Sequence, residues 1–347
     1  MNISNSLFIG AFIPHSQIFS KKVLEIDPGQ ETSKICNSMR ELLARSFRRR
    51  GYVVAVSGGI DSSVTLALAA KAVGPERVLA LLMPETHSAP ETLDLSRRVA
   101  DRFNVAQHHE NISAVLEAVG FYDRYAEAVR RVIPGYDREW KSKIVLPSLL
   151  TRDGFRLFSV VAQKPDGTTI KGRLSLDAYL EVVAATNFKQ RTRKMLEYYH
   201  ADRLNYAVAG TPNRLEYDQG FFVKLGDGAA DVKPIAHLYK TQVYQLAEYL
   251  GVPEEVRTRP PTTDTYSLPQ GQDEFYFSLP FDKMDLCLYG KNNGVGSEVV
   301  AGAIGLTPDQ VQRVYADIDT KRNGTRYLHL PPMLAAAVPE IDAHGEE

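Results

Sequence analysis

The sequence contains only two cysteines, Cys36 and Cys287, in 347 residues. Their separation matches neither the closely spaced pairs of cysteine-rich metal sites nor a disulfide framework. A fold built around a cysteine-rich metal site and a fold held by a disulfide framework are therefore both excluded. We expect a reducing compartment, which makes the cytoplasm the expected location.

The sequence also lacks an excess of positive or negative charge. The formal net charge is −1 and no block of five like charges occurs, so we expect no nucleic-acid partner. The basic cluster 48–50 instead suits the end of a helix, where cations complement the helix dipole.

Long hydrophobic runs are missing as well. The apolar stretch Leu7–Ile13 is far too short to span a bilayer, and it lacks the basic residues and cleavage pattern of a signal peptide. We expect no membrane partner. We interpret residues 1–32 as an N-terminal arm that packs on the body of the protein or on a partner subunit.

What is present is an ordinary globular composition, 44% hydrophobic and 24% charged. Strand and helix patterns alternate along it, which predicts an α/β fold: a doubly wound parallel sheet with helices on both faces. We expect strands over 52–57, 78–83, 105–109 and 206–209, and helices over 33–50, 64–71, 90–103 and 113–131.

The segment 133–172 interrupts this alternation. It contains three prolines, and two apolar stretches, 155–161 and 168–170, flank the turn sequence Pro165-Asp166-Gly167. We interpret it as a hairpin region inserted into one domain that covers residues 33–332. Residues 333–347 then form a C-terminal tail.

The most informative motif is Ser-Gly-Gly-Ile-Asp-Ser-Ser over 57–63, between a predicted strand and a predicted helix. Its glycines let an anion approach the backbone, and the free amides of the helix start attract that anion. Asp61 adds a carboxylate that can hold a metal among phosphate oxygens. The simpler alternative is a turn in which Asp61 and Ser62 only cap the helix. The motif resembles the SGGxDS pyrophosphate loop of the ATP pyrophosphatase superfamily, whose members split ATP between its α- and β-phosphates.

A second motif, 210–216, follows the short strand 206–209. Parallel strands present their carboxyl ends at one edge of the sheet, so the two loops are expected to face each other. Glu216 would then complete a magnesium site with Asp61. A solvated loop acid is the alternative interpretation of Glu216.

The residues that follow carry a more specific resemblance. They read Gly-Phe-Phe-Val-Lys-Leu-Gly-Asp-Gly-Ala-Ala-Asp over 220–231, then Leu-Tyr-Lys over 238–240, Pro-Thr-Thr-Asp over 261–264 and Gln-Asp-Glu over 272–274. With these motifs the chain from about 33 to 332, apart from the insertion, resembles the ammonia-dependent NAD synthetase family. The resemblance implies an adenine nucleotide α-hydrolase-like version of the predicted fold.

Members of that family adenylate the nicotinate carboxylate of deamido-NAD with ATP, release pyrophosphate, and let ammonia displace AMP. The resemblance thus implies an enzyme, a C–N ligase of NAD biosynthesis, with ATP as co-substrate, Mg²⁺ as cofactor and deamido-NAD and ammonia as partners. It also favours a homodimer with the dinucleotide site at the subunit interface. The chain has no room for the amidase domain of glutamine-using relatives, which leaves open a separate glutaminase partner.

The resemblance also assigns residues. Those that would bind ATP are Ser57, Gly58, Gly59, Asp61, Ser62, Ser63, Met83, Thr211, Lys240 and Thr262. The metal would be held by Asp61 and Glu216, and the catalytic group would be Asp61, Glu216, Asp227 and Lys240. Those that would bind deamido-NAD are Arg191, Lys224, Asp231 and Lys321.

Some of these residues have plainer alternatives. Asp227 sits in a Gly-Asp-Gly turn and could be a capping Asx turn, and Thr262 could be a turn residue. Lys240 as a surface lysine that opens a helix is disfavoured, because lysine suits helix ends better than helix starts. Lys321 departs from the family pattern, since the chain reads Thr-Lys-Arg over 320–322 where members often carry His-Lys.

Arg191 is also supported by helical spacing. Ala184, Phe188, Arg191 and Met195 lie on one predicted helical face with apolar neighbours. A guanidinium on such a face needs an anion or a partner carboxylate. Deamido-NAD and an intersubunit salt bridge both supply one.

Three other functions compete with this prediction. A related amide ligase would adenylate a different carboxylic acid, which the insertion and the 320–322 departure allow. A tRNA-modifying pyrophosphatase would need a nucleic-acid face or catalytic cysteines, and Cys36 and Cys287 lie outside both loops. A nucleotide-binding protein without catalysis is disfavoured by the complete set of Asp61, Glu216 and Lys240.

Overall fold

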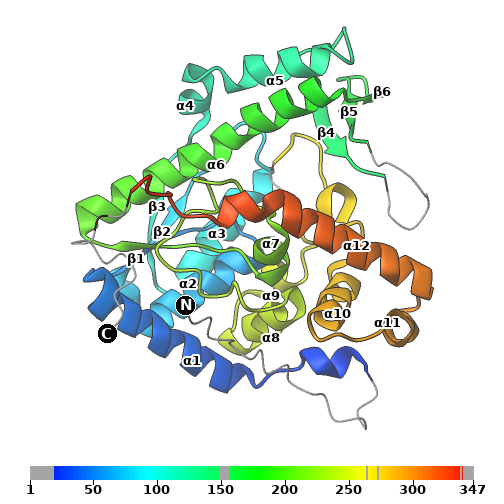
Figure 1. Ribbon diagram of the computed structural model, residues 1–347. Coiled ribbons are helices and arrows are strands. Elements are labelled where there is room, and N and C mark those ends of the chain that lie inside the picture. The colour runs from blue at the N-terminus through cyan, green and yellow to red at the C-terminus, as the bar shows by residue number, and fades with distance from the viewer. Residues whose placement is uncertain (1–18, 148–156, 263–264, 272, 337, 339–347) are drawn as a thin grey trace.

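The computed structural model describes residues 19–147, 157–262, 265–271, 273–336 and 338. The predicted arm segment Leu7–Ile13 lies outside these residues, as does most of the predicted tail. At the centre is a parallel sheet in the order β3-β2-β1-β7 (Figure 1). Its strands are β1 (Tyr52–Ala55), β2 (Val78–Leu82), β3 (Ala106–His109) and β7 (Ala207–Ala209).

This strand order confirms the predicted doubly wound sheet. From β1 the chain steps outward through β2 to β3, and it then returns to place β7 on the other side of β1. The winding direction therefore reverses between β1 and β7. Ligands of such sheets bind beyond the carboxyl ends of the strands at this switch point, where the loops at Ser57 and Gly210 follow β1 and β7.

Helices cover both faces of the sheet. Side chains of β1 alternate between two cores: Tyr52 and Val54 point to one, and Val53 points to the other. The first core packs against α1 (Pro28–Glu41), α2 (Ile60–Val73), α3 (Pro90–Arg102) and α8 (Lys240–Leu250). The second packs against α4 (Ser113–Ala118), α5 (Phe121–Arg130) and α6 (Leu176–Leu204), the long helix that crosses Figure 1.

Two helix predictions need correction. The single helix expected over 113–131 is two helices, because Gly120 adopts a left-handed backbone (φ 70°) between α4 and α5. The helix expected over 33–50 begins earlier, at Pro28, and ends in a π-helical turn, Leu42–Phe47. The basic cluster does follow this helix end, with Arg48 in the left-handed region (φ 51°).

The segment 133–172 forms an antiparallel sheet of β4 (Lys141–Val145), β5 (Ser159–Gln163) and β6 (Thr169–Arg173). The predicted hairpin is confirmed, with Gly167 at φ 87° in its turn. Strand β4 escaped prediction because its sequence is largely polar. It buries only alternate residues, and the buried Ser142 hydroxyl lies 2.9 Å from the hydroxyls of both Tyr125 and Tyr136.

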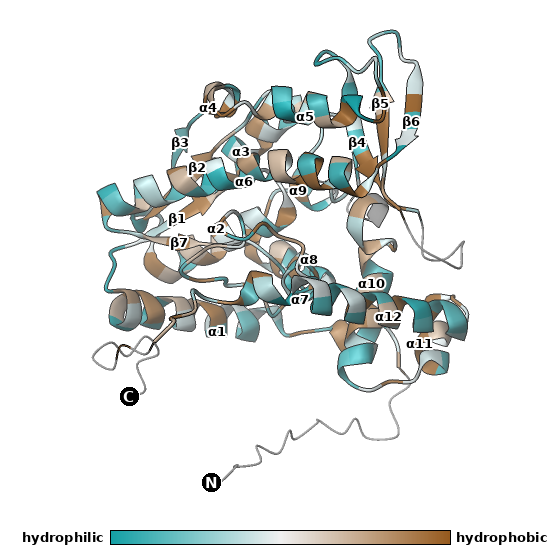
Figure 2. Cartoon of the chain, turned by 45° about the horizontal axis from the view of Figure 1, so that its top comes forward, coloured by the Kyte–Doolittle hydropathy of each residue, from teal (hydrophilic) through white to brown (hydrophobic). Residues whose placement is uncertain are grey.

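A third core joins the C-terminal helices α10 (Phe281–Asn292), α11 (Ser297–Ile304) and α12 (Pro308–Thr325) to α7 (Arg214–Gln219). Figure 2 shows hydrophobic residues in β1 and β5, with polar residues on outward faces of the helices. The remaining short helices are Lys21–Leu24, Pro75–Arg77, α9 (Glu254–Arg257), Asp273–Phe277 and Arg326–His329. Among the described residues, none of the helices is both long and apolar enough to cross a membrane.

Candidate active site

A cavity of about 430 Å³ lies at the carboxyl edge of the central sheet, where β1 and β7 diverge. The two predicted loops meet in its wall, together with α6, the start of α8 and the segment 259–262. Predicted site residues that line it are Ser57, Gly58, Gly59, Asp61, Ser62, Met83, Thr211, Glu216, Asp227, Lys240 and Thr262.

The Ser57 loop is shaped by Gly58 and by hydroxyl groups. Gly58 has φ 69°, and a Cβ there would lie 2.9 Å from Leu95 Cβ and 3.0 Å from the Thr92 carbonyl of α3. No other residue fits so close an approach without displacing α3. The Ser62 hydroxyl donates to the Gly59 carbonyl at 3.0 Å and accepts from the Ser57 amide at 3.2 Å. The loop thus opens α2 with its first-turn amides facing the cavity edge, a setting that favours an anion.

Asp61 and Lys240 form an ion pair that joins the start of α2 to the start of α8. Lys240 is 1% exposed. Burial alone would lower the lysine pKa, but the charges of Asp61 and Glu216 outweigh it, so the pKa of Lys240 is raised. Lys240 is therefore a fixed cation in the cavity wall, not the surface lysine of the alternative interpretation.

Both predicted metal ligands hydrogen-bond to one residue, Asn213. Its side-chain amide donates to Asp61 at 3.1 Å, and its backbone amide donates to Glu216 at 3.1 Å in the capping box of α7. The expectation that these acids lie on open loops was wrong: Asp61 is in the first turn of α2 and Glu216 in that of α7. The alternative in which Asp61 and Ser62 only cap α2 is wrong, because the N-cap residue Gly59 makes no side-chain cap hydrogen bond. The alternative of a solvated loop acid is wrong for Glu216, which belongs to the capping box of α7 and lines the cavity.

These carboxylates fit a divalent cation. Burial, together with the charge of Asp61, raises the pKa of Glu216 well above its usual range, although Lys240 opposes the shift. Without a bound cation, the Glu216 carboxyl therefore keeps its proton near neutral pH, and a cation bound here would take the place of that proton. Carboxylate oxygens beside a phosphate-binding loop are what Mg²⁺ takes in proteins, and Asp61 and Glu216 are the residues that would hold it.

Sequence reasoning missed Asp285 of α10, which positions Lys240. Its buried carboxylate accepts the backbone amides of Lys240 at 3.2 Å and Thr241 at 2.6 Å, and the Thr241 hydroxyl at 2.6 Å. It thereby caps a helix whose own sequence offers no Ser, Thr, Asp or Asn at the cap position. Burial raises the pKa of Asp285 to about 6. No local pattern could have revealed this contact, because 45 residues separate the partners.

A row of charged residues on α6 was missed as well. Four charged residues of α6 line the cavity: Lys189, Arg193, Lys194 and Glu197. Lys189, Arg193 and Glu197 recur every four residues, a spacing that a helix projects on one face, and Lys194 lies three residues before Glu197. Lys194 pairs with Glu197 at 2.7 Å. The spacing of these charged residues is visible in the sequence. They were not predicted as site residues because attention went to the apolar face of α6.

Lys189 pairs at 2.7 Å with Glu85, which follows β2, and it donates to the Thr265 carbonyl at 2.9 Å. It also lies 3.3 Å from Nδ1 of His87. Burial, with the charge of Lys189, lowers the pKa of His87 to about 4. His87 is therefore neutral in the folded chain at physiological pH.

Asp227 lines the cavity and accepts the backbone amide of Val223 at 2.7 Å. This contact is not the Asx turn expected as its alternative role, because the donor amide precedes Asp227 by four residues instead of following it by two. Burial raises the pKa of Asp227, partly offset by the Val223 hydrogen bond and by Lys194 and Arg193.

The other predicted residues lie outside the cavity lining. The Ser63 hydroxyl donates to the Gly59 carbonyl at 2.8 Å. Lys224 donates to the Tyr327 carbonyl at 2.8 Å, and Lys321 donates to the Tyr276 carbonyl at 2.7 Å. Asp231 accepts the Val208 amide at 2.7 Å. The four residues assigned to deamido-NAD therefore do not converge within the cavity of this single chain.

Arg191 lies on the predicted face of α6, but that face is exposed. Its Nε donates to the Lys224 carbonyl at 3.4 Å. The same face carries Leu176, Leu180, Met195 and Tyr199, each more than half exposed. In one chain this apolar face is therefore exposed, and α6 instead buries the charged residues Lys189, Lys194 and Glu197.

His87 provides a pH-dependent prediction. The folded chain protonates His87 only near pH 4, whereas the unfolded chain protonates it near pH 6.5, so the stability from keeping it neutral is present above pH 6.5 and lost as pH falls toward 4. Between pH 7.5 and 5 the wild type should lose about 2 kcal/mol more unfolding free energy than His87→Gln. Urea titrations at both pH values measure this. His109→Gln, at an exposed histidine of β3, is the control and should lose as much as the wild type. Equal losses for wild type and His87→Gln would contradict the assignment.

Comparisons with known proteins agree with this geometry. The model of the NAD synthase family matches residues 31–132 and 164–324. An NH(3)-dependent NAD(+) synthetase of Rhizobium meliloti (strain 1021) is 57% identical over 325 residues, which cover 94% of this chain and 97% of that protein. The enzyme of the same name from Thermotoga maritima is 33% identical over 271 residues, 77% of this chain and 87% of its own.

Two solved structures share the fold. NMN synthetase from Francisella tularensis aligns with a TM-score of 0.60 at 20% identity, over 89% of this chain and 99% of its own. NH3-dependent NAD synthetase from Campylobacter jejuni, in complex with the nitrate ion, aligns with a TM-score of 0.58 at 21% identity, over 90% of this chain and 100% of its own. With the family match over most of its length and the Rhizobium protein at 57% identity, this chain belongs to the NAD synthase family.

Proposed function

We propose that this chain is an ammonia-dependent NAD synthetase. It converts deamido-NAD, ATP and ammonia to NAD, AMP and pyrophosphate through an acyl-adenylate. The observation that carries the proposal is the meeting of the Ser57 loop, the Asp61–Lys240 pair and Glu216 in one cavity. The name of the Rhizobium relative, 57% identical over 94% of this chain, supports the same reaction.

In the adenylation step the Ser57 loop would hold the leaving pyrophosphate. Loop amides and the Ser57 hydroxyl would be donors placed before the substrate arrives, so they would stabilise growing negative charge with little reorganisation. Lys240, held in place by Asp61 and Asp285, adds a fixed positive charge. Mg²⁺ between Asp61 and Glu216 would neutralise phosphate charge. Met83, Thr211 and Thr262 of the lining complete the proposed ATP site.

In the amidation step Asp227 is the proposed partner of ammonia. It lies in the cavity beyond the Ser57 loop, and its raised pKa brings it closer to the range useful for accepting a proton. Its hydrogen bond from Val223 fixes one oxygen and leaves the other for the incoming nucleophile. Ammonia itself is the proposed nitrogen donor, as in the names of the relatives; a separate glutaminase that supplies it remains the alternative source.

We further propose a homodimer that pairs α6 with α6 of a second copy. The exposed stripe Leu176, Leu180, Met195 and Tyr199 spans 24 residues of helix, about 35 Å, and an apolar stripe of this length is typical of a subunit interface. Arg191 lies on this stripe beside Lys224, whose ammonium packs 4.9 Å from the Tyr327 ring. The proposed deamido-NAD residues, Asp231 and Lys321 included, would then act at or near the interface.

The remaining proposals concern organisation and location. Residues 33–332 would form the catalytic domain, with 133–172 inserted, 1–32 as an arm and 333–347 as a tail. The family match, which skips 133–163, supports an insertion at that place. A cytoplasmic location agrees with the two buried, free cysteines.

The reaction is tested by incubating the purified chain with ATP, Mg²⁺, ammonium and deamido-NAD. We expect NAD, AMP and pyrophosphate to form in equal amounts. Chromatography and phosphorus NMR measure these products. Nicotinate mononucleotide, which lacks the AMP half, is the competing acid and should be the poorer substrate. Faster turnover of the mononucleotide would favour a ligase for a different acid, and ADP as the main product would refute the adenylation mechanism.

The shared cation is tested with Asp61→Asn and Glu216→Gln. Each should lower kcat/KM by about 100-fold or more, since each removes a carboxylate from one charge-stabilising unit. Because both act on one ion, the double variant should be scarcely worse than the worse single variant. Asp94→Asn, at an exposed acid of α3, is the control. Thermal unfolding of each variant separates loss of activity from loss of fold. If the loss of kcat/KM in the double variant equals the product of the two single losses, the two residues do not share one ion.

The homodimer is tested with Leu180→Asp and Met195→Asp. A buried carboxylate on the α6 stripe should shift the chain from dimer to monomer in sedimentation velocity and raise KM for deamido-NAD more than KM for ATP. Val299→Asp, at an equally exposed position on α11, should leave the dimer intact. A wild-type mass of one chain, or unchanged dimers in both α6 variants, would reject the proposed interface.

A further inference from the structure

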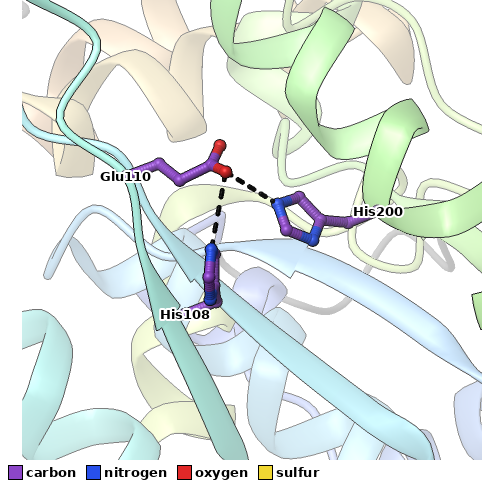
Figure 3. Close-up of side chains that lie close together, drawn as sticks. All are labelled: His108, Glu110 and His200. Carbon is purple, nitrogen blue, oxygen red and sulfur yellow. Dashed lines mark ion pairs between the residues drawn. The ribbon is translucent and has the colours of Figure 1, made fainter. Parts of the chain in front are cut away.

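Three side chains with metal-binding atoms converge at the edge of the central sheet, on residues outside the cavity lining. His108 lies on the edge strand β3, Glu110 follows that strand, and His200 projects from α6 (Figure 3). Their ligand atoms all lie within 4.8 Å of one another. Because side chains two residues apart in a strand share a face, His108 and Glu110 present their groups together toward α6.

The two distances from Glu110 to the imidazoles suit a bound ion better than a pair of hydrogen bonds. Oε1 of Glu110 lies 3.4 Å from Nε2 of His108 and 3.3 Å from Nε2 of His200. A charge-assisted hydrogen bond would be about 2.7–2.9 Å long. A tetrahedral zinc ion bound at about 2.0–2.1 Å places its ligand atoms about 3.3–3.4 Å apart.

Unsatisfied polar atoms point to the same conclusion. Over the part of the chain that the structure describes, Oε2 of Glu110 and Nε2 of His200 are buried without a hydrogen-bond partner. Burying such polar atoms costs folding free energy unless a ligand from outside the protein binds to them. His108 is 45% exposed at its side chain, so an ion can enter from solvent and water can take the fourth position.

We propose that His108, Glu110 and His200 form a binding site for a divalent transition metal, with Zn²⁺ as the preferred ion. Two imidazoles and one carboxylate favour zinc over Mg²⁺, which prefers oxygen ligands alone. The site is separate from the cation proposed at Asp61 and Glu216, and it does not depend on the proposed function.

One contact must change when the metal binds. Nδ1 of His200 accepts a hydrogen bond from Nε of Arg203 at 2.9 Å, so in the metal-free chain the proton of His200 sits on Nε2. Metal binding at Nε2 moves this proton to Nδ1, which then repels the Arg203 donor. Arg203 is exposed on the last turn of α6 and turns into water without disturbing the core.

A metal here ties α6 to the sheet edge. His200 follows Glu197 by three residues, close to one helical turn, and Glu197 pairs with Lys194 in the cavity wall. The ion would therefore fix the end of α6 that carries part of the candidate active site. Its expected effect is on stability, because none of the three ligands lines the cavity.

The test uses metal-stripped full-length chain in excess Mg²⁺, which occupies any oxygen-ligand site. Titration with Co²⁺, a spectroscopic substitute for Zn²⁺, should saturate at one ion per chain with the visible absorption of tetrahedral cobalt. Competition with Zn²⁺ should abolish that absorption, and Zn²⁺ should raise the thermal midpoint of the wild type.

Variants decide whether this cluster is the site. His108→Ala changes an accessible side chain and should weaken binding by at least about 100-fold, as loss of one of three ligands costs more than loss of an outer partner. Glu110→Gln keeps the shape of the site and should weaken binding similarly. His109→Ala, at the next residue of β3 and on its opposite face, should bind like the wild type. The proposal is overturned if the wild type fails to bind Co²⁺ or Zn²⁺. It is also overturned if His108→Ala and Glu110→Gln bind these ions as tightly as the wild type does.

Discussion

The buried ion pair between Asp61 and Lys240 is the interaction on which the site depends. Asp61 belongs to the first turn after the Ser57 loop, and Lys240 opens α8 some 179 residues later. Asp285 of α10 caps the same helix start, so elements of the central sheet and of the C-terminal core meet at one lysine. Replacing Asp61 would leave the buried Lys240 with only the weaker influence of Glu216, so both the fold and the cavity depend on this pair. The pair thus links folding of the C-terminal helices to the assembly of the cavity.

Several charged side chains that line the cavity are already paired within the protein. Lys189 has Glu85 and Lys194 has Glu197, each at 2.7 Å and each buried. Paired charges keep fixed positions and directions, so the field they set up exists before any substrate enters. Glu216 differs, because burial and the nearby Asp61 push its pKa upward. A cation bound beside the phosphate-binding loop would let Glu216 ionise in this buried position.

The inserted sheet also shapes the cavity. Phe158, the residue before β5, stacks on Tyr179 of α6, with ring centroids 4.3 Å apart and planes at 15°. Both residues line the cavity. The family match skips 133–163, which contains Phe158. This part of the cavity wall therefore comes from residues that the family model does not match.

The sequence by itself determined the sheet, the two loops and the family. Buried strands such as 52–55 and the glycine turn after them are local patterns, since period, propensity and turn chemistry act within a few residues. The motif order from Gly210 to Lys240 specified which loops would meet, because parallel strands end at one edge. The inserted hairpin at 165–167 was likewise local.

Only the tertiary structure decided which face of α6 is buried and which residues pair with each buried charge. The apolar stripe with Met195 looked like the core face, yet packing placed Lys189 and Lys194 inside, because partners such as Glu85 come from distant strands. The cap that Asp285 gives to Lys240 and the convergence of His108, Glu110 and His200 also join distant segments. Pairwise contacts of this kind leave no periodic trace in a single sequence, since each partner alone is an ordinary polar residue.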